Sequence, residues 1–309
     1  MTITKNCFDR FFVTPMSKIR IFTDSCSDLG ADIRAKYDIE YLKMCTVFEG
    51  KESPADLDWP ERTPHEFYDV MRGGKRFTTT QVPVEEFRTR FTEVLDAGDC
   101  IIYIGCALPL SSSVNTGKVV ARQLTEQYPN AVIHCIDAIN SSLGEGMLTV
   151  YAATLRNEGK SVDEIVAAVE EKKHTINQFV TVGSLDMLKK AGRVKGSAAF
   201  FGNLFGVKPI IISDKNGQNM PIVKVKGRRP SLDELCRLAA EAVIDPAGQT
   251  VFIGHADCPA DAEYLREKLM RELGFADAYV NHIGPIIGSC IGPDAIGVWV
   301  VGKTVEVAV

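Results

Sequence analysis

Residues 100–117, CIIYIGCALPLSSSVNTG, contain the pattern that decides the fold. Residues 100–106 are almost entirely apolar and rich in isoleucine, without the alternation of a half-exposed strand. Such a run is typical of a strand that is buried on both faces of a parallel sheet. A turn rich in hydroxyl groups follows it and opens a predicted helix. Strand, turn and helix in this order indicate an α/β fold.

The same alternation recurs along the 309-residue chain. Capping boxes that begin at Thr63, Ser161 and Ser231 predict helix starts, and a further helix is expected at 259–273. Helices that alternate with strands indicate βαβ units and mostly parallel sheets. We expect strands at 19–23, 100–106, 131–136, 179–182, 209–212, 222–225, 250–255, 278–283 and 296–301.

The length of the chain suggests two domains, at about 150 residues per domain. We place the boundary between the helix that starts at Ser161 and the strand at 179–182. This predicts an N-terminal α/β domain at 17–172 and a C-terminal α/β domain at 173–309. Residues 1–16 precede what looks like a natural start, so we expect them to form a disordered tail.

The composition excludes several classes of protein. Hydrophobic residues make up 45% of the chain, charged residues 24%, and the formal net charge is −5. These values exclude a disordered chain and argue against a protein that coats nucleic acid or an anionic membrane. The two most apolar windows, 100–117 and 283–302, contain prolines or glycines, so we expect no stable membrane insertion.

The cysteines and the N-terminus favour a cytoplasmic protein. The nine cysteines are scattered and form no C-x-x-C pair, so neither a disulfide framework nor a metal site is expected. The first 15 residues lack the apolar length of a signal peptide.

Loops rich in hydroxyl groups follow several predicted strands. Ligands of open α/β sheets bind beyond the carboxyl ends of the strands. Each hydroxyl could simply cap a helix. Together these loops could instead hold a carboxylate or a phosphate with hydroxyl and backbone N–H donors. The serines and the threonine concerned are Ser25, Thr79, Ser111, Ser112, Ser113 and Ser141.

Common motifs of catalysis and nucleotide binding find no support in the sequence. It has no G-x-S-x-G, and no G-x-G-x-x-G after the first strand. Residues 297–304, GVWVVGKT, have the spacing of a phosphate-binding loop, but they overlap the apolar strand expected at 296–301 and so form no glycine-rich loop. Asp24 and Asp137, each at the end of a predicted strand, could form an acid–base pair, or could order their loops. The pair leaves open a hydrolase or transferase that acts on a small phosphorylated or carboxylated substrate.

Three segments of the second half carry further signals. Basic residues lie in a turn at Arg193 and in a cluster that includes Lys226 and Arg228, which suit an acidic partner or a phosphate, or a solvated charged edge. Residues 196–207 are small and aromatic, either core or the wall of an apolar tunnel. The tunnel residues we select there are Phe200, Phe201 and Leu204. A glycine-rich turn at 284–295 contains Ile287, Gly288 and Cys290.

These segments occur together in the DegV family of bacterial fatty-acid-binding proteins, which the chain resembles from about residue 17 to its end. No single segment is diagnostic, but their order and coverage make the resemblance specific. The matching segments are IFTDSCSDL at 21–29, TTQ at 79–81, Leu110-Ser111, Asp137 with Ser141, Gly144 and Gly146, LKKAGR at 188–193, VKPI at 207–210, and the turn at 284–295.

The resemblance implies two α/β domains with one long-chain fatty acid between or beneath them. It places the carboxylate-binding residues at Thr79 and Ser111, and puts Cys290 where the family often has histidine. It also implies that the basic turn at Arg193 meets a partner such as a fatty acid kinase, and we assign Lys226 and Arg228 of the second basic cluster to the same docking role. The chain would be a carrier rather than an enzyme, with the fatty acid as ligand and no other cofactor. A regulatory module that signals its bound lipid through Arg193 and Arg228 is the third possibility.

Overall fold

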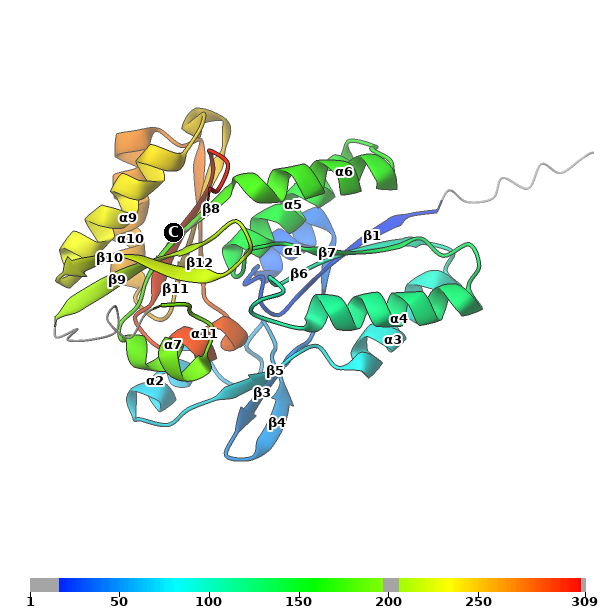
Figure 1. The fold of residues 1–309 in the computed structure, drawn as a ribbon, viewed down its shortest axis with the longest axis horizontal. Helices are drawn as coiled ribbons and strands as arrows, with labels where there is room; N and C mark the ends of the chain where they lie inside the picture. Colours follow the sequence, from blue (N-terminus) through cyan, green and yellow to red (C-terminus); the bar gives the residue numbers. More distant parts are fainter. Residues whose placement is uncertain (1–16, 197–205, 307–309) are drawn as a thin grey trace, which may run out of the picture.

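The computed structural model describes residues 17–196 and 206–306, which contain two main sheets (Figure 1). The first sheet has the order β2-β1-β6-β7, and all its neighbouring strands are parallel. Its strands are β1 (Ile19–Asp24), β2 (Ile39–Leu42), β6 (Cys100–Gly105) and β7 (Ile133–Asp137). The apolar run at 100–106 therefore forms an inner strand, as its composition predicts.

Helices cover both faces of this sheet (Figure 1). Phe87 and Phe91 of α3 pack with Val120 and Leu124 of α4 in one core cluster on one face. On the other face, Leu148 and other residues of α5 pack against β1 and β6. The helices of this half are α1 (Ala31–Tyr37), α3 (Val84–Asp96), α4 (Ser113–Gln127), α5 (Leu143–Asn157) and α6 (Val162–Lys172), followed by the 3-10 helix η1 (Lys173–Thr175).

The second sheet has six strands in the order β10-β9-β8-β13-β11-β12. The α/β fold class is confirmed, but parallel pairing is wrong for this sheet except between β11 and β12. A tight turn joins β9 to β10, and such a turn can connect only antiparallel strands. The strands are β8 (Ile176–Thr181), β9 (Val207–Ser213), β10 (Asn219–Lys226), β11 (Thr250–His255), β12 (Asp277–His282) and β13 (Ile296–Val301).

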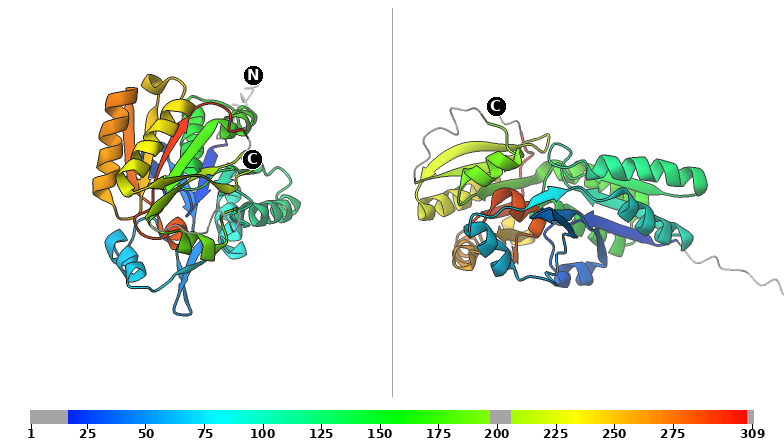
Figure 2. Two further views of the ribbon diagram at one scale, coloured as in Figure 1. Left: turned by 60° about the vertical axis from the view of Figure 1, so that its left-hand side comes forward. Right: turned by 90° about the horizontal axis from the view of Figure 1, so that it is seen from below.

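Two long helices, α9 (Arg228–Ala242) and α10 (Pro259–Leu273), lie side by side over one face of the second sheet (Figure 2). α5 contacts β8 and β11 as well as the first sheet, so it links the two sheets. The predicted start of a helix at Ser231 is wrong, because α9 begins three residues earlier and the Ser231 hydroxyl donates to the Arg228 carbonyl instead. The capping boxes at Thr63 and Ser161 are confirmed.

Shorter elements, most of which the sequence did not predict, complete the fold. A three-stranded sheet has the order β4-β3-β5, formed by β3 (Cys45–Phe48), β4 (Lys51–Pro54) and β5 (Thr78–Thr80). The expected glycine-rich turn at 284–295 contains a helix, α11 (Pro285–Ile291), which packs against α7 (Leu185–Ala191). The remaining elements are α2 (Pro64–Arg72) and the 3-10 helix η2 (Pro246–Gly248). Over the ranges 17–196 and 206–306, no helix has the length and apolarity to cross a bilayer.

Candidate functional site

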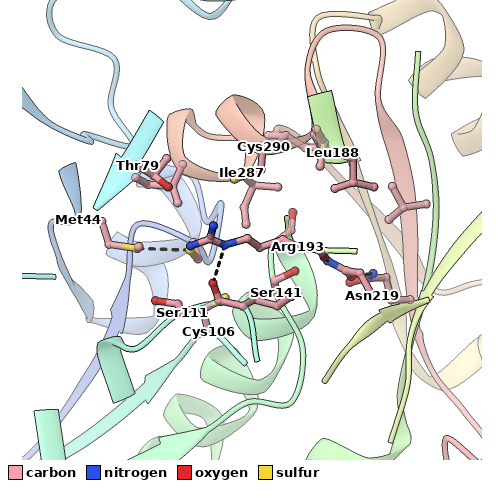
Figure 3. Close-up of a pocket in the computed structure, with 18 of the residues that line it drawn as sticks. Met44, Thr79, Cys106, Ser111, Ser141, Leu188, Arg193, Asn219, Ile287 and Cys290 are labelled. Carbon is pink, nitrogen blue, oxygen red and sulfur yellow. Dashed lines mark hydrogen bonds between the residues drawn. The ribbon is translucent and has the colours of Figure 1, made fainter. Parts of the chain in front are cut away.

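A cavity of about 260 Å³ lies where the first sheet, the second sheet and the small sheet meet (Figure 3). Apolar residues from several elements line it together with hydroxyl, amide and sulfur groups. The apolar residues are Leu110, Val180, Val182, Leu188, Ile211, Ile283, Ile286, Ile287, Ile291 and Trp299. The polar and sulfur-containing residues are Cys26, Met44, Thr79, Thr80, Gln81, Cys106, Ser111, Ser112, Ser141, Ser142, Gln178, Arg193, Asn219 and Cys290.

The polar atoms on the second sheet's side of the cavity are paired with one another. The Trp299 indole N–H donates to Gln178 Oε1 at 3.3 Å, and the Gln178 amide donates to Asn219 Oδ1 at 3.1 Å. Their pairing leaves the side chains of Val180 and Ile211 as a wall suited to hydrocarbon.

Hydrogen bonds around Ser113 bring the hydroxyl groups of two separate segments to this cavity. Ser113 Oγ accepts the Val82 N–H at 3.2 Å and lies 3.0 Å from Ser111 Oγ. Ser113 is fully buried and does not line the cavity. It instead fixes the start of α4 to the loop after β5, so that Thr79 and Ser111 face the same space (Figure 3).

Arg193 is the one cationic side chain among the described residues that line the cavity. Its Nε donates to the Leu110 carbonyl at 3.3 Å, and Nη1 donates to the Ala191 carbonyl at 2.7 Å. The side chain crosses the cavity, and its guanidinium group points toward the side that carries Ser111 (Figure 3). The resemblance suggested a role in partner docking, whereas this position also offers a positive charge to a bound anion.

Cys290 lines the cavity from α11, near Thr79 (Figure 3). Burial raises the pKa of the Cys290 thiol, so the group is neutral at ordinary pH. Thr79, Arg193 and Cys290 also line a smaller hollow of about 130 Å³, together with Arg76 and Lys190. Because the two hollows share these residues, the polar end of the cavity lies beside a cluster of basic side chains.

Several residues selected from the sequence lie elsewhere. Ser25 Oγ donates to the Ala55 carbonyl and accepts the Met44 N–H, so it ties loops together outside the cavity lining. Gly288 packs on Tyr68, whose Oη would be 2.4 Å from an added Cβ atom. Ser112, Ser141 and Ile287 line the cavity.

The second basic cluster is also remote from the cavity lining. Lys226 is exposed at the end of β10, and Arg228 pairs with Asp261 at 2.7 Å. Phe200, Phe201 and Leu204, the predicted tunnel residues, lie outside the described residues.

Asp24 and Asp137 order their own loops and do not line the cavity. The Asp24 carboxylate accepts the Tyr103 hydroxyl at 2.7 Å and the Cys26 N–H at 2.8 Å. Asp137 Oδ1 accepts the Ile139 N–H at 2.9 Å. The two carboxylates therefore do not form the acid–base pair that an enzyme would need at this site.

Sequence reasoning missed the wall that β8 supplies. Gln178, Val180 and Val182 are spaced by two residues, so their side chains share one face of the strand. This spacing was a readable signal. Which of the two faces meets the cavity, however, depends on how the sheets pack against each other.

Comparisons with known proteins agree with this architecture. The family model described as an uncharacterised protein of the DegV family matches residues 18–303. A DegV domain-containing protein of Clostridium perfringens is 36% identical over 291 residues, which cover 94% of this chain and 100% of the relative.

Solved structures show the same fold. A fatty-acid-binding DegV family protein from Thermus thermophilus is 25% identical, with a TM-score of 0.82, over 93% of this chain and 100% of that one. A stearic-acid-binding protein from Eubacterium ventriosum is 22% identical, also with a TM-score of 0.82, over 93% of this chain and 99% of that one.

Proposed function

Because the chain belongs to the DegV family, we propose that it binds a long-chain fatty acid in the cavity between its sheets. We further propose that it is a cytoplasmic carrier that presents the carboxylate to a partner such as a fatty acid kinase. The observation that carries the proposal is the mixed lining of the cavity, in which apolar residues such as Val180 and Ile211 occur together with hydroxyl groups and Arg193. The structural neighbour from Thermus thermophilus is a fatty-acid-binding protein, which supports the same class of ligand for this chain.

The apolar wall accounts for affinity. Each buried methylene contributes about 0.8 kcal/mol, so about 14 of them give a gross gain of roughly 11 kcal/mol. Loss of translational freedom and ordering of the acyl chain reduce this gain considerably. Enough remains for tight binding, provided that the carboxylate does not lose its own hydration without replacement.

The hydroxyl side supplies that replacement. A desolvated carboxylate needs hydrogen-bond donors, and Thr79 and Ser111 offer hydroxyl groups from two segments that Ser113 holds together. Arg193 adds a positive charge on the same side. The carboxylate would therefore lie at this end, with the acyl chain against Val180 and Ile211.

The basic hollow supports presentation to a partner. Arg76 and Lys190 flank the residues at the proposed carboxylate end, and both are exposed. A surface of this charge attracts an acidic partner. The segment with the spacing of a phosphate-binding loop, GVWVVGKT at 297–304, lies largely in β13 and forms no such loop, so the phosphoryl transfer would fall to the partner.

Titration of delipidated protein with oleate or palmitate by calorimetry, alongside native mass spectrometry of the purified chain, tests fatty acid binding. We expect one acyl chain per protein. Ser111→Ala and Thr79→Val should each weaken binding about 10- to 100-fold, because a hydrogen bond to a charged group is worth about 1.5–3 kcal/mol. Ser161→Ala, far from the cavity, is the matched control. Absence of both co-purified lipid and uptake of added fatty acid would refute the proposal.

A second experiment separates presentation from binding. Arg76→Glu combined with Lys190→Glu should slow phosphorylation of the bound acid by a fatty acid kinase while leaving fatty acid affinity unchanged. Lys226→Glu, at an exposed site outside the hollow, serves as the control. An unchanged rate in the double variant would contradict kinase presentation at this surface. Capture of another protein only in the presence of fatty acid, without phosphorylation, would favour the signalling module instead.

A further inference from the structure

Three buried side chains from distant parts of the sequence meet at the edge of the cavity. Cys26 follows β1, Cys106 follows β6, and Glu145 lies in the first turn of α5. One ligand atom of each lies within 4.8 Å of the others. The two cysteines are 2% exposed and Glu145 is fully buried. Both cysteines line the cavity, and Cys106 lies on the side that carries Ser111 (Figure 3).

Glu145 has an oxygen atom that no other group satisfies. Its Oε1 accepts the Thr23 hydroxyl at 2.7 Å and the Asp24 N–H at 3.5 Å. Its Oε2 is buried and has no hydrogen-bond partner within residues 17–196 and 206–306. A buried carboxylate oxygen without a partner is costly, so its position calls for a group that can bind it.

Neighbouring residues fix the positions of all three side chains. The Asp24 carboxylate accepts the Cys26 N–H at 2.8 Å and the Cys106 N–H at 3.5 Å, so one group holds both cysteine backbones. Thr23 orients Glu145 through the hydrogen bond to Oε1. Carboxylates and hydroxyls in this supporting role are typical of the shell of residues around protein metal sites.

We propose that Cys26, Cys106 and Glu145 bind a zinc ion in the wall of the cavity. Two thiolates and one carboxylate are a donor set that suits Zn²⁺ better than the hard cations Mg²⁺ and Ca²⁺. Tetrahedral zinc with Zn–S bonds of about 2.3 Å places its ligands about 3.8 Å apart. The three groups, within 4.8 Å of one another, can reach that spacing by small side-chain rotations.

Three protein ligands leave a fourth coordination position. Because Cys26 and Cys106 line the cavity while Glu145 lies behind them, this position faces the cavity, where water can complete the coordination. The cavity also gives the ion an entry path. On binding, each thiol and the buried Glu145 carboxyl, whose pKa burial raises, release their protons to solvent, and the ion bonds to both sulfur atoms and the carboxylate without any change of oxidation state. The inference does not depend on the fatty acid.

Metal analysis and cobalt substitution test the site on the full chain. The protein is reduced, stripped with a chelator, and titrated with Zn²⁺ alone and then with Co²⁺ alone. We expect one equivalent of zinc by elemental analysis. Co²⁺ should give a thiolate-to-cobalt charge-transfer band and the visible bands of tetrahedral coordination. Failure of reduced protein to bind either ion would overturn the proposal. A Cys26–Cys106 disulfide that persists in reductant would overturn it as well.

Variants assign the ligands. Cys26→Ser and Cys106→Ser should each abolish the charge-transfer contribution of the altered sulfur. Cys236→Ser, which changes a buried cysteine of α9 in the core of the second half, should leave the spectrum unchanged. Thr23→Val keeps the shape of the side chain and removes its hydrogen bond to Glu145, so zinc affinity should fall about 10- to 100-fold. Circular dichroism checks that each variant is folded. A cobalt spectrum of Cys106→Ser identical to that of the parent chain would refute the assignment, and Thr23→Val tests it if the serine variants do not fold.

Discussion

Replacement of Asp28 by asparagine should make the free energy of unfolding less dependent on pH, because the buried Asp28 carboxyl titrates differently in the native and unfolded states. Asp28 is 1% exposed and joins the first half of the chain to the second. Its Oδ1 accepts the Gly284 N–H at 2.8 Å, and its Oδ2 lies 2.5 Å from the Ser142 hydroxyl. Burial raises the pKa of this carboxyl to about 8. The group is therefore protonated in the native state near neutral pH.

The sign and size of the effect follow from proton linkage. An unfolded aspartate has a pKa of about 3.9, so between pH 4 and 8 the native state holds one more proton than the unfolded state. The stability that the protonated carboxyl contributes is full below pH 4 and is lost as the pH rises toward 8. The free energy of unfolding should fall by at most about 1.4 kcal/mol per pH unit, or about 2 kcal/mol from pH 6.5 to 8.

Asp28→Asn keeps the geometry, because its Oδ1 still accepts the Gly284 N–H and its amide can donate to Ser142. Urea unfolding at a series of pH values from 6.5 to 8.5 gives the free energy of unfolding of both proteins. We expect the parent chain to lose stability relative to the variant as the pH rises. His255, whose pKa burial lowers to about 4, stays neutral in the native state throughout this window, and the titration of its unfolded form near pH 6.5 affects both proteins equally. Asp163→Asn, at an exposed site, is the control. Parallel curves for Asp28→Asn and the parent chain would refute the reasoning.

Two further substitutions test local structure by chemical denaturation. Thr63→Ala removes the hydroxyl that accepts the Glu66 N–H at the start of α2, so the free energy of unfolding should fall by about 1 kcal/mol. Thr125→Ala, whose hydroxyl caps no helix start, should lower it by less. Equal losses in the two variants would contradict the capping role of Thr63. Gly146→Ala places a Cβ atom 2.8 Å from the Ser27 carbonyl oxygen, so about 1–3 kcal/mol should be lost. In Gly73→Ala the added Cβ atom comes no closer than 3.4 Å to the atoms around it, so the free energy of unfolding should hardly change. An unchanged free energy of unfolding in Gly146→Ala would contradict the expected clash with the loop after β1.

Long apolar segments made the fold readable from the sequence. All nine expected strands occur. Apolar runs such as 100–106 and 250–255 must be buried in any fold, so their strands can be predicted without knowing how the sheets are arranged. The small sheet escaped prediction because β4 and β5 are short and polar, and they become strands only by pairing with β3. The direction of the strands in the second sheet was also hidden. Apolar runs report burial, whereas strand direction depends on the connections between them.

Less of the candidate site than of the fold could be predicted from the sequence. Thr79 and Ser111 were found through a family resemblance, and the structure places both on one cavity. The inward reach of Arg193 was not readable, because the same basic turn could equally have pointed to solvent. A cluster such as Cys26, Cys106 and Glu145 has no spacing signal at all. Its members come together only because parallel strands end at the same edge of a sheet, beside the start of α5.

Cys290, at the position where the family resemblance suggests a histidine, bears on how the proposed fatty acid would be held. A histidine beside a carboxylate can donate a hydrogen bond and carry a charge near neutral pH. The buried Cys290 thiol is neutral and a weak donor, because burial raises its pKa. Arg193 offers a positive charge to the same cavity. Head-group recognition in this chain should therefore depend more on Arg193 and on the hydroxyls of Thr79 and Ser111 than on the residue at position 290.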